Sequence, residues 1–265
     1  MRMTVIAGCI ALASAGLVGR RGAIRVLRRL KGGATMRAHT ALDEIDDKGN
    51  FKRTAAGFQN SIAPGTRFEP EVGRYHLYVA LGCPWAAGTL AALKHKGLDK
   101  VITYSIVHPT WRRTRPDDEK DEHCGWHFCA PGDDPVSNQL GHGSFECDDA
   151  LIPDTVNGCK TIRELYEMAG DVTGKYSTPV LWCKKEGTIV CNESLEILKL
   201  FDSAFDKLCA HPERKLFKPD EMEAAEALNQ FIYPTVNNGV CASAGLYPAT
   251  LGCRLALPAS RCLYC

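Results

Sequence analysis

Strand and helix patterns alternate after residue 74, and this alternation constrains the fold of the 265-residue chain more than any other feature. RYHLYVAL places alternate residues from Tyr75 to Leu81 on one side of an extended chain, which predicts a strand. AAGTLAALKHKGL follows with helical spacing and ends at Gly97, and VITYSIV predicts a buried strand over 101–107. We expect these three segments to form a βαβ unit with parallel strands and a right-handed crossover.

Five later segments continue this pattern. A short helix is expected over 161–169, and STPVLW and GTIVCN predict two strands joined by a turn. Asn192-Glu193-Ser194 opens a helix in LEILKLFDSAF, and EMEAAEALNQFIYPTV predicts another. This order is that of an α/β, thioredoxin-like domain. The segment 108–158, rich in Asp, Gly, Pro and His, predicts no regular element.

Charge and cysteine content exclude several classes of function. The chain has 32 basic and 31 acidic residues and a formal net charge of +1, so nothing in its charge favours nucleic acid as a partner. No stretch is a clean membrane span. The 13 cysteines are odd in number and irregular in spacing, which indicates a reducing compartment rather than a disulfide scaffold.

The first residues have the composition of a targeting leader. Eight Lys or Arg residues precede the first acidic residue, Asp43, in an Ala-rich segment typical of a transit peptide. The apolar run TVIAGCIALASAGLVG leaves open a secretory signal or the first half of a two-part leader. We expect a chloroplast or mitochondrial location if the leader is used, and a cytoplasmic one if translation starts at Met36.

Cys83, in LGCPWAAGTL, is the candidate nucleophile. It follows a predicted strand at the start of a predicted helix, where free backbone N–H groups and the helix dipole favour a thiolate. Pro84 fits the first helical position. Ala86 stands where a C-x-x-C motif has its second cysteine, so an outside thiol such as glutathione must resolve the site. The alternative is a buried, inert cysteine.

Two further tripeptides support a site around this thiol. Thr178-Pro179-Val180 opens the third predicted strand, and in thioredoxin-like domains such a proline is cis and faces the active cysteine. Ser194 and the helix start could hold a carboxylate, and Glu193 could pair with an ammonium. Glutathione carries both groups at its γ-glutamyl end. An edge-strand proline and ordinary helix capping are the simpler alternatives.

From about Ala41 to Val240 the chain resembles the glutathionyl-hydroquinone reductases, or Xi-class glutathione transferases. The matching text includes GRYHLYVALGCPWAAGTLAALKHKGLDKVI, VHPTWRRT, DEHCGWHF, STPVLWCKKEGTIVCNESLEILKLF and FIYPTVNNGV. The resemblance implies a thioredoxin-like N-terminal domain and an all-helical C-terminal domain, incomplete here. The expected parts are a leader (1–35), an extended arm (36–73), a thioredoxin-like domain (74–208), the start of the helical domain (209–240) and an atypical tail (241–265).

The resemblance also implies roles for particular residues. Cys83 would be the catalytic thiol, and Tyr233 is the candidate proton donor. Glutathione would be held by Trp126, Lys175, Thr178, Pro179, Glu193 and Ser194. Thr178 stands where the family usually has valine, and Lys175 where many members have arginine, which loses the bidentate fork but keeps the charge.

The implied reaction reduces glutathionyl-hydroquinones to hydroquinone and oxidised glutathione, through a mixed disulfide between Cys83 and glutathione. Glutathione is the co-substrate, glutathionyl-quinone conjugates are the expected partners, and no metal takes part. Family members are commonly homodimers. The alternatives are a glutaredoxin-like deglutathionylase, a dehydroascorbate reductase, or a truncated glutathione-binding protein without turnover.

The resemblance ends at Val240, where Cys241 replaces an expected tyrosine. The last 25 residues contain four cysteines and no acidic residue, and we hypothesise a shifted reading frame, a retained intron or an alternative exon. Loss of the following helices predicts an exposed apolar patch and an incomplete quinone pocket. A zinc site at His123, Cys124, His127 and Cys129 is disfavoured by its unusual spacing. A dinucleotide-binding fold is disfavoured because no glycine fingerprint follows a strand.

Overall fold

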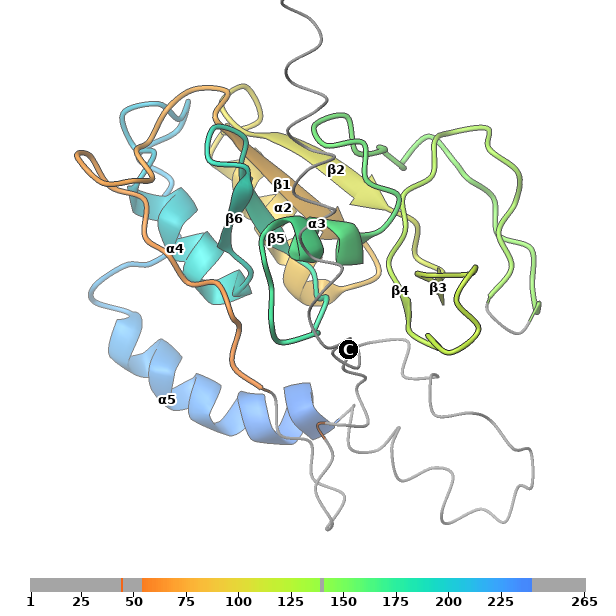
Figure 1. The fold of residues 1–265 in the computed structure, drawn as a ribbon. Helices are drawn as coiled ribbons and strands as arrows, with labels where there is room; N and C mark the ends of the chain where they lie inside the picture. Colours follow the sequence, from red (N-terminus) through yellow and green to blue (C-terminus); the bar gives the residue numbers. More distant parts are fainter. Residues whose placement is uncertain (1–43, 45–53, 139–140, 240–265) are drawn as a thin grey trace, which may run out of the picture. The chain divides into compact units, whose positions relative to one another are not determined.

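The computed structural model describes Glu44 and residues 54–138 and 141–239, and Figure 1 shows their fold. The expected leader and tail lie outside the described residues. In chain order the elements are β1 (Tyr75–Ala80), α2 (Pro84–His95), β2 (Thr103–Val107), β3 (Arg112–Arg113), β4 (Cys124–Gly125), α3 (Ile162–Met168), β5 (Val180–Cys183), β6 (Thr188–Cys191), α4 (Ser194–Ser203), α5 (Met222–Ile232) and a π-helix (Tyr233–Asn237).

Four strands form a mixed sheet in the order β2-β1-β5-β6. β1 and β2 are parallel, with Val79 opposite Ile106, whereas β1–β5 and β5–β6 are antiparallel. The parallel pair joined by α2 confirms the predicted βαβ unit. β5 and β6 are joined by a turn that ends at Gly187, whose φ of 59° lies in the left-handed region that glycine tolerates best. The topology is the thioredoxin-like one expected from the sequence.

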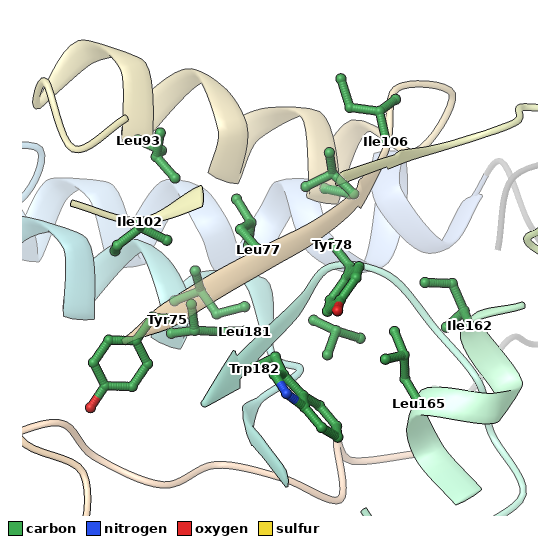
Figure 2. Packing of buried hydrophobic residues seen from close by; sticks show 14 of the residues in the cluster. Tyr75, Leu77, Tyr78, Leu93, Ile102, Ile106, Ile162, Leu165, Leu181 and Trp182 are labelled. Atoms are coloured by element: carbon green, nitrogen blue, oxygen red, sulfur yellow. The ribbon is translucent and has the colours of Figure 1, made fainter. Parts of the chain in front are cut away.

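The core lies on both faces of this sheet, because every residue of β1 is buried. Successive strand residues point to opposite faces, so Leu77 and Tyr78 enter two different layers. Figure 2 shows Leu93 of α2 over the Leu77 face and Leu165 of α3 on the side of Tyr78. Each fully buried leucine of this kind contributes roughly 2 kcal/mol of apolar burial. α2 also packs against α4, so α4 supports the helix that covers the Leu77 face of the sheet.

Three elements begin or end at other residues than the sequence predicts. Val101 and Ile102 do not belong to β2, because their amides donate to Leu98 O in a turn, each at 2.8 Å. β5 begins at Val180, directly after Pro179, which has no N–H to offer a ladder. α5 ends at Ile232 and continues as a π-helix, since Pro234 cannot donate a helical hydrogen bond.

The segment 108–158, for which the sequence predicts no element, is organised by contacts between distant residues. Ile106 of β2 exchanges backbone hydrogen bonds with Ile152. The Asp154 carboxylate accepts hydrogen bonds from the Tyr78 hydroxyl at 2.8 Å and from the backbone N–H groups of Val156, Asn157 and Cys159 at 3.0, 3.1 and 3.0 Å. The Asp154 carboxylate and the Ile106–Ile152 backbone pair therefore both hold this segment on the sheet.

The described part of the arm runs along the free edge of β6. Gln59 forms an antiparallel bridge with Cys191, and Asn60 N donates to Val190 O at 3.0 Å. Asn192 holds the same stretch: its N–H donates to Phe58 O, and its Oδ1 accepts from Phe58 N, both at 3.0 Å. Residues 58–60 thus run alongside β6 as an extended segment. Among the described residues no helix is both long and apolar enough to cross a membrane.

Candidate active site

Cys83 lies at the junction of β1 and α2. It is the N-cap residue of α2, and Pro84 occupies the first helical turn as the sequence predicts. The residue is 8% exposed, and its Sγ–H donates to Thr178 O across a distance of 3.8 Å. Its sulfur therefore lies beside the strand-opening Thr178-Pro179 pair, although 95 residues separate them in sequence.

A cleft of about 220 Å³ opens around this sulfur. Its walls come from six parts of the chain: the arm, the start of α2, Trp126 after β4, the approach to β5, the start of α4 and Tyr233 of the π-helix. All eight site residues predicted from the sequence line it, namely Cys83, Trp126, Lys175, Thr178, Pro179, Glu193, Ser194 and Tyr233. The structure thus gathers into one cleft residues that span 150 positions of sequence.

The wall next to Cys83 is formed by the approach to β5. The Thr178–Pro179 peptide bond is cis, as expected for a thioredoxin-like domain. Ser177, immediately before it, is held by the Tyr166 hydroxyl, which donates to Ser177 O at 3.0 Å. Tyr166 in turn accepts from Asn192 Nδ2 at 2.9 Å. This chain of hydrogen bonds ties the two wall segments, 177–179 and 192–194, to each other.

The start of α4 forms another wall. Glu193 is the N-cap residue, and its Oε1 accepts from Leu195 N at 3.4 Å. Ser194 is the first helical residue, and its hydroxyl has only a long contact of 3.5 Å with the same Oε1. Both side chains face the cleft while making weak local hydrogen bonds. A helix N-terminus with a hydroxyl at its first position is suited to an anionic group.

Lys175 is paired across the cleft wall with a residue that sequence reasoning missed. Its Nζ donates to Glu44 Oε1 at 2.5 Å and to Thr54 O at 3.3 Å. Glu44 also lines the cleft, and its side chain is 4% exposed. No periodicity or motif in the arm marks Glu44, so only its position in the fold identifies it. Gly57 of the arm also lines the cleft and was missed for the same reason. Asn192, another lining residue, stands in the Asn192-Glu193-Ser194 motif, but the sequence analysis assigned no site role to it.

Aromatic rings line the remaining wall. Trp126 is 5% exposed and packs edge-to-face on Trp111, with 5.3 Å between ring centroids. Trp85 and Tyr233 lie with their ring centroids 6.4 Å apart, so the π-helix after α5 brings its tyrosine to the mouth of the cleft. A flat apolar ligand could lie against such rings.

The four residues weighed as a zinc site lie in different surroundings. His123 Nδ1 hydrogen-bonds Thr114 Oγ1 at 2.8 Å, whereas His127 stacks on His108 with ring centroids 5.2 Å apart. Burial lowers the pKa of both histidines to about 4 and raises the pKa of Cys129 to about 12. Within the described ranges no three His, Cys, Asp or Glu side chains are grouped to hold a metal ion.

Comparison with known proteins gives a consistent result. Residues 82–204 match the family described as glutathione S-transferase, N-terminal domain. The chain is 37% identical over 210 residues to the glutathionyl-hydroquinone reductase YqjG of Escherichia coli, an alignment covering 76% of this chain and 56% of the relative.

Solved structures agree. A glutathione S-transferase Xi from Phanerochaete chrysosporium is 34% identical, with a TM-score of 0.57, over 75% of this chain and 63% of that one. The glutathione-bound structure of YqjG is 30% identical, with a TM-score of 0.53, over 72% and 59% of the two chains. This chain therefore spans a little over half the length of the curated relatives it matches.

Proposed function

By its thioredoxin-like domain the chain belongs to the Xi-class glutathione transferases, and on this premise we propose that it uses glutathione to reduce glutathionyl-hydroquinones. The observation that carries the proposal is the single cleft in which Cys83 meets every residue assigned to glutathione from the sequence. The proposed chemistry needs a nucleophilic sulfur, a tripeptide site and room for an aromatic ring. Cys83, the polar walls of the cleft and the Trp85–Tyr233 ring pair support these three roles.

In the first step the Cys83 thiolate attacks the sulfur of the glutathionyl thioether. The carbon–sulfur bond breaks, its electron pair goes to the aromatic carbon, and a mixed disulfide between Cys83 and glutathione forms. The carbon takes up a proton, and hydroquinone leaves. Tyr233 is the proposed donor because its ring lies at the cleft mouth beside Trp85, where the aromatic group would bind.

In the second step the thiolate of another glutathione attacks the mixed disulfide. Oxidised glutathione leaves, and Cys83 is released as a thiolate. Ala86 stands on α2 where a second cysteine would otherwise offer an internal attack, so the outside thiol is required. We propose that the positive end of the α2 dipole, where Cys83 lies, favours the departing sulfur as an anion.

Glutathione is held in this proposal by three parts of the cleft. The backbone of Thr178 pairs with the cysteinyl unit of the tripeptide, next to Cys83. Ser194 and the start of α4 receive the γ-glutamyl carboxylate, and Glu193 faces its ammonium. Lys175 binds the remaining carboxylate of glutathione, which belongs to the glycyl unit.

Turnover of a glutathionyl-menadiol by the full chain tests the proposal, with Cys83→Ser measured beside it. We expect loss of activity in Cys83→Ser and, in the wild-type protein, a mixed disulfide with glutathione detectable by intact-mass spectrometry. Cys209→Ser is the matched control, because Cys209 is partly exposed and donates to Asp206 O outside the cleft. Equal turnover by Cys83→Ser would refute the proposed role of the thiol.

A deglutathionylase is a second candidate, favoured by the single cysteine at the start of α2. Cleaving a mixed disulfide between glutathione and a protein or a small thiol needs only Cys83 and the parts of the cleft that bind glutathione. No carbon is protonated in this reaction, so no proton donor such as Tyr233 is required. Comparing rates on a glutathionyl-hydroquinone, a glutathione mixed disulfide and dehydroascorbate separates the candidates. A Tyr233→Phe variant should slow only the first of these reactions.

A further inference from the structure

Glu44 forms the closest charged contact inside the cleft. Its Oε1 accepts from Lys175 Nζ at 2.5 Å and from Thr54 N at 2.6 Å. The Glu44 side chain is 4% exposed, and that of Lys175 is 29% exposed. The carboxylate is therefore fixed in the wall by the backbone of the arm, while the ammonium remains accessible from the cleft.

The charges of the cleft make this contact consequential. Among the described residues that line it, Lys175 is the one Lys or Arg, whereas Glu44 and Glu193 both bring carboxylates. The lysine ammonium has three N–H donors, of which one goes to Glu44 and one points to Thr54 O. A ligand carboxylate that reaches Lys175 must share the ammonium with Glu44 or displace it.

We propose that Glu44 competes with the glycyl carboxylate of glutathione for Lys175 and thereby weakens binding at the cleft. The inference rests on the proposed function, whose glutathione site it refines. Glu44 has two opposing effects on binding. It orients the Lys175 ammonium, which favours binding of a ligand. It also neutralises the charge of that ammonium and repels a ligand carboxylate, which disfavours binding of an anionic ligand. The repulsion dominates because both charges lie in a partly desolvated wall, where charge interactions exceed those in water several-fold.

Glu44→Gln separates the two effects. The amide oxygen of glutamine keeps an acceptor for Thr54 N and for Lys175 Nζ, so the orientation is retained while the negative charge is removed. Glu186→Gln is the matched control: it removes one carboxylate from the molecule at the turn before β6, where Glu186 pairs with Arg67 outside the cleft.

Binding is measured by calorimetry on the full chain with two probes that form no disulfide, S-methylglutathione and its glycyl carboxamide. We expect Glu44→Gln to bind S-methylglutathione about three- to tenfold more tightly than wild type, with under twofold change for the carboxamide. Glu186→Gln should leave both affinities unchanged. Lys175→Met should bind the two probes equally, because the group that distinguishes a carboxylate from an amide is gone.

Weaker binding of S-methylglutathione by Glu44→Gln would show that orientation dominates and would overturn the inference. An unchanged affinity, or an equal gain for both probes, would overturn it as well. In each of these cases wild-type binding and Cys83-dependent turnover leave the proposed function standing. If neither wild type nor Glu44→Gln binds either probe, both the function and the inference fail.

Discussion

His76 shows how a single buried residue links stability to pH. It lies in β1, is 1% exposed, and its ring nitrogens are 2.6 Å from Thr103 Oγ1 and 2.9 Å from Ser105 Oγ. Burial lowers its pKa to about 4, against a small opposing effect of Asp154. Its neutral ring is part of the hydrogen bonding between β1 and β2. The same direction of shift applies to His123 and His127, which are also buried.

The free energy of unfolding should therefore fall on acidification. In the unfolded chain histidine binds a proton near pH 6.5, whereas native His76 does so only near pH 4. Its contribution is complete above pH 6.5 and is lost as the pH falls towards 4, by roughly 2–3 kcal/mol. Urea unfolding between pH 7 and pH 4.5 measures this slope. His76→Gln should reduce the slope, to which His123 and His127 still contribute, and His142→Gln, at an exposed position, is the control substitution.

At the scale of elements, α2 and α4 are joined by a buried ion pair. Lys96, at the end of α2, is fully buried, and its Nζ lies 3.5 Å from Asp202 Oδ1 and from Asp206 Oδ1. Asp202 also accepts from Leu216 N at 2.8 Å, and so fixes the chain that leads towards α5. The pair links the helix that carries Cys83 at its start to the helix that carries Ser194.

Removing the Lys96 side chain should lower the free energy of unfolding by more than its 3.5 Å contacts with the two aspartates suggest. Lys96→Met leaves the buried Asp202 carboxylate without its cation, so we expect a loss of about 3 kcal/mol or more in the free energy of unfolding. Lys94→Met, on the same helix, removes an exposed pair with Asp99 at 3.9 Å and should cost under about 1 kcal/mol. Chemical denaturation of both variants checks this; similar values for the two would contradict it.

Which elements the sequence could predict depends on how local their causes are. β1 and α2 follow from apolar spacing, a proline at the first helical turn and Gly97 with φ of 64° at the end. By contrast, β3 and β4 are two residues each, and their segment is closed by Asp154 bonding to Tyr78, 76 positions away. No window of sequence contains that contact.

The candidate site divides in the same way. Cys83, Pro179 and Ser194 belong to short motifs at element ends, where strand, proline and helix start are visible in a few letters. Glu44 is held at the cleft by Thr54 N and Lys175 Nζ, and the arm that carries it has no periodicity that would mark this residue. Its side chain faces Lys175 from a distance of 131 positions. The cleft residues at the ends of strands and helices could be predicted from the sequence, whereas those of the arm could not.

At the scale of the described molecule, α5 stands apart because it buries no residue. Leu228 is 58% exposed and Phe231 is 65% exposed. Surfaces of this kind attract other apolar surfaces in water. Because both side chains are exposed, we expect the stability of the sheet and its three packed helices not to depend on them.

Leu228→Glu and Phe231→Glu should therefore lower self-association while changing the free energy of unfolding by under about 0.5 kcal/mol. Sedimentation velocity over a range of concentrations measures the first quantity and urea unfolding the second. Asn229→Glu adds the same charge at a polar position of the same helix and is the control. Equal effects of all three variants would assign any change to charge alone.

The pairing of Gln59 and Asn60 with β6 has a consequence beyond the cleft. β6 is an outer strand of the sheet, and an outer strand whose N–H and C=O groups face water is a template on which a foreign chain can add. Here the protein's own backbone occupies part of that template. Proteolysis that removes the chain up to residue 60 would therefore leave the outer edge of β6 unpaired, and other chains could then add to it as strands and form fibrils.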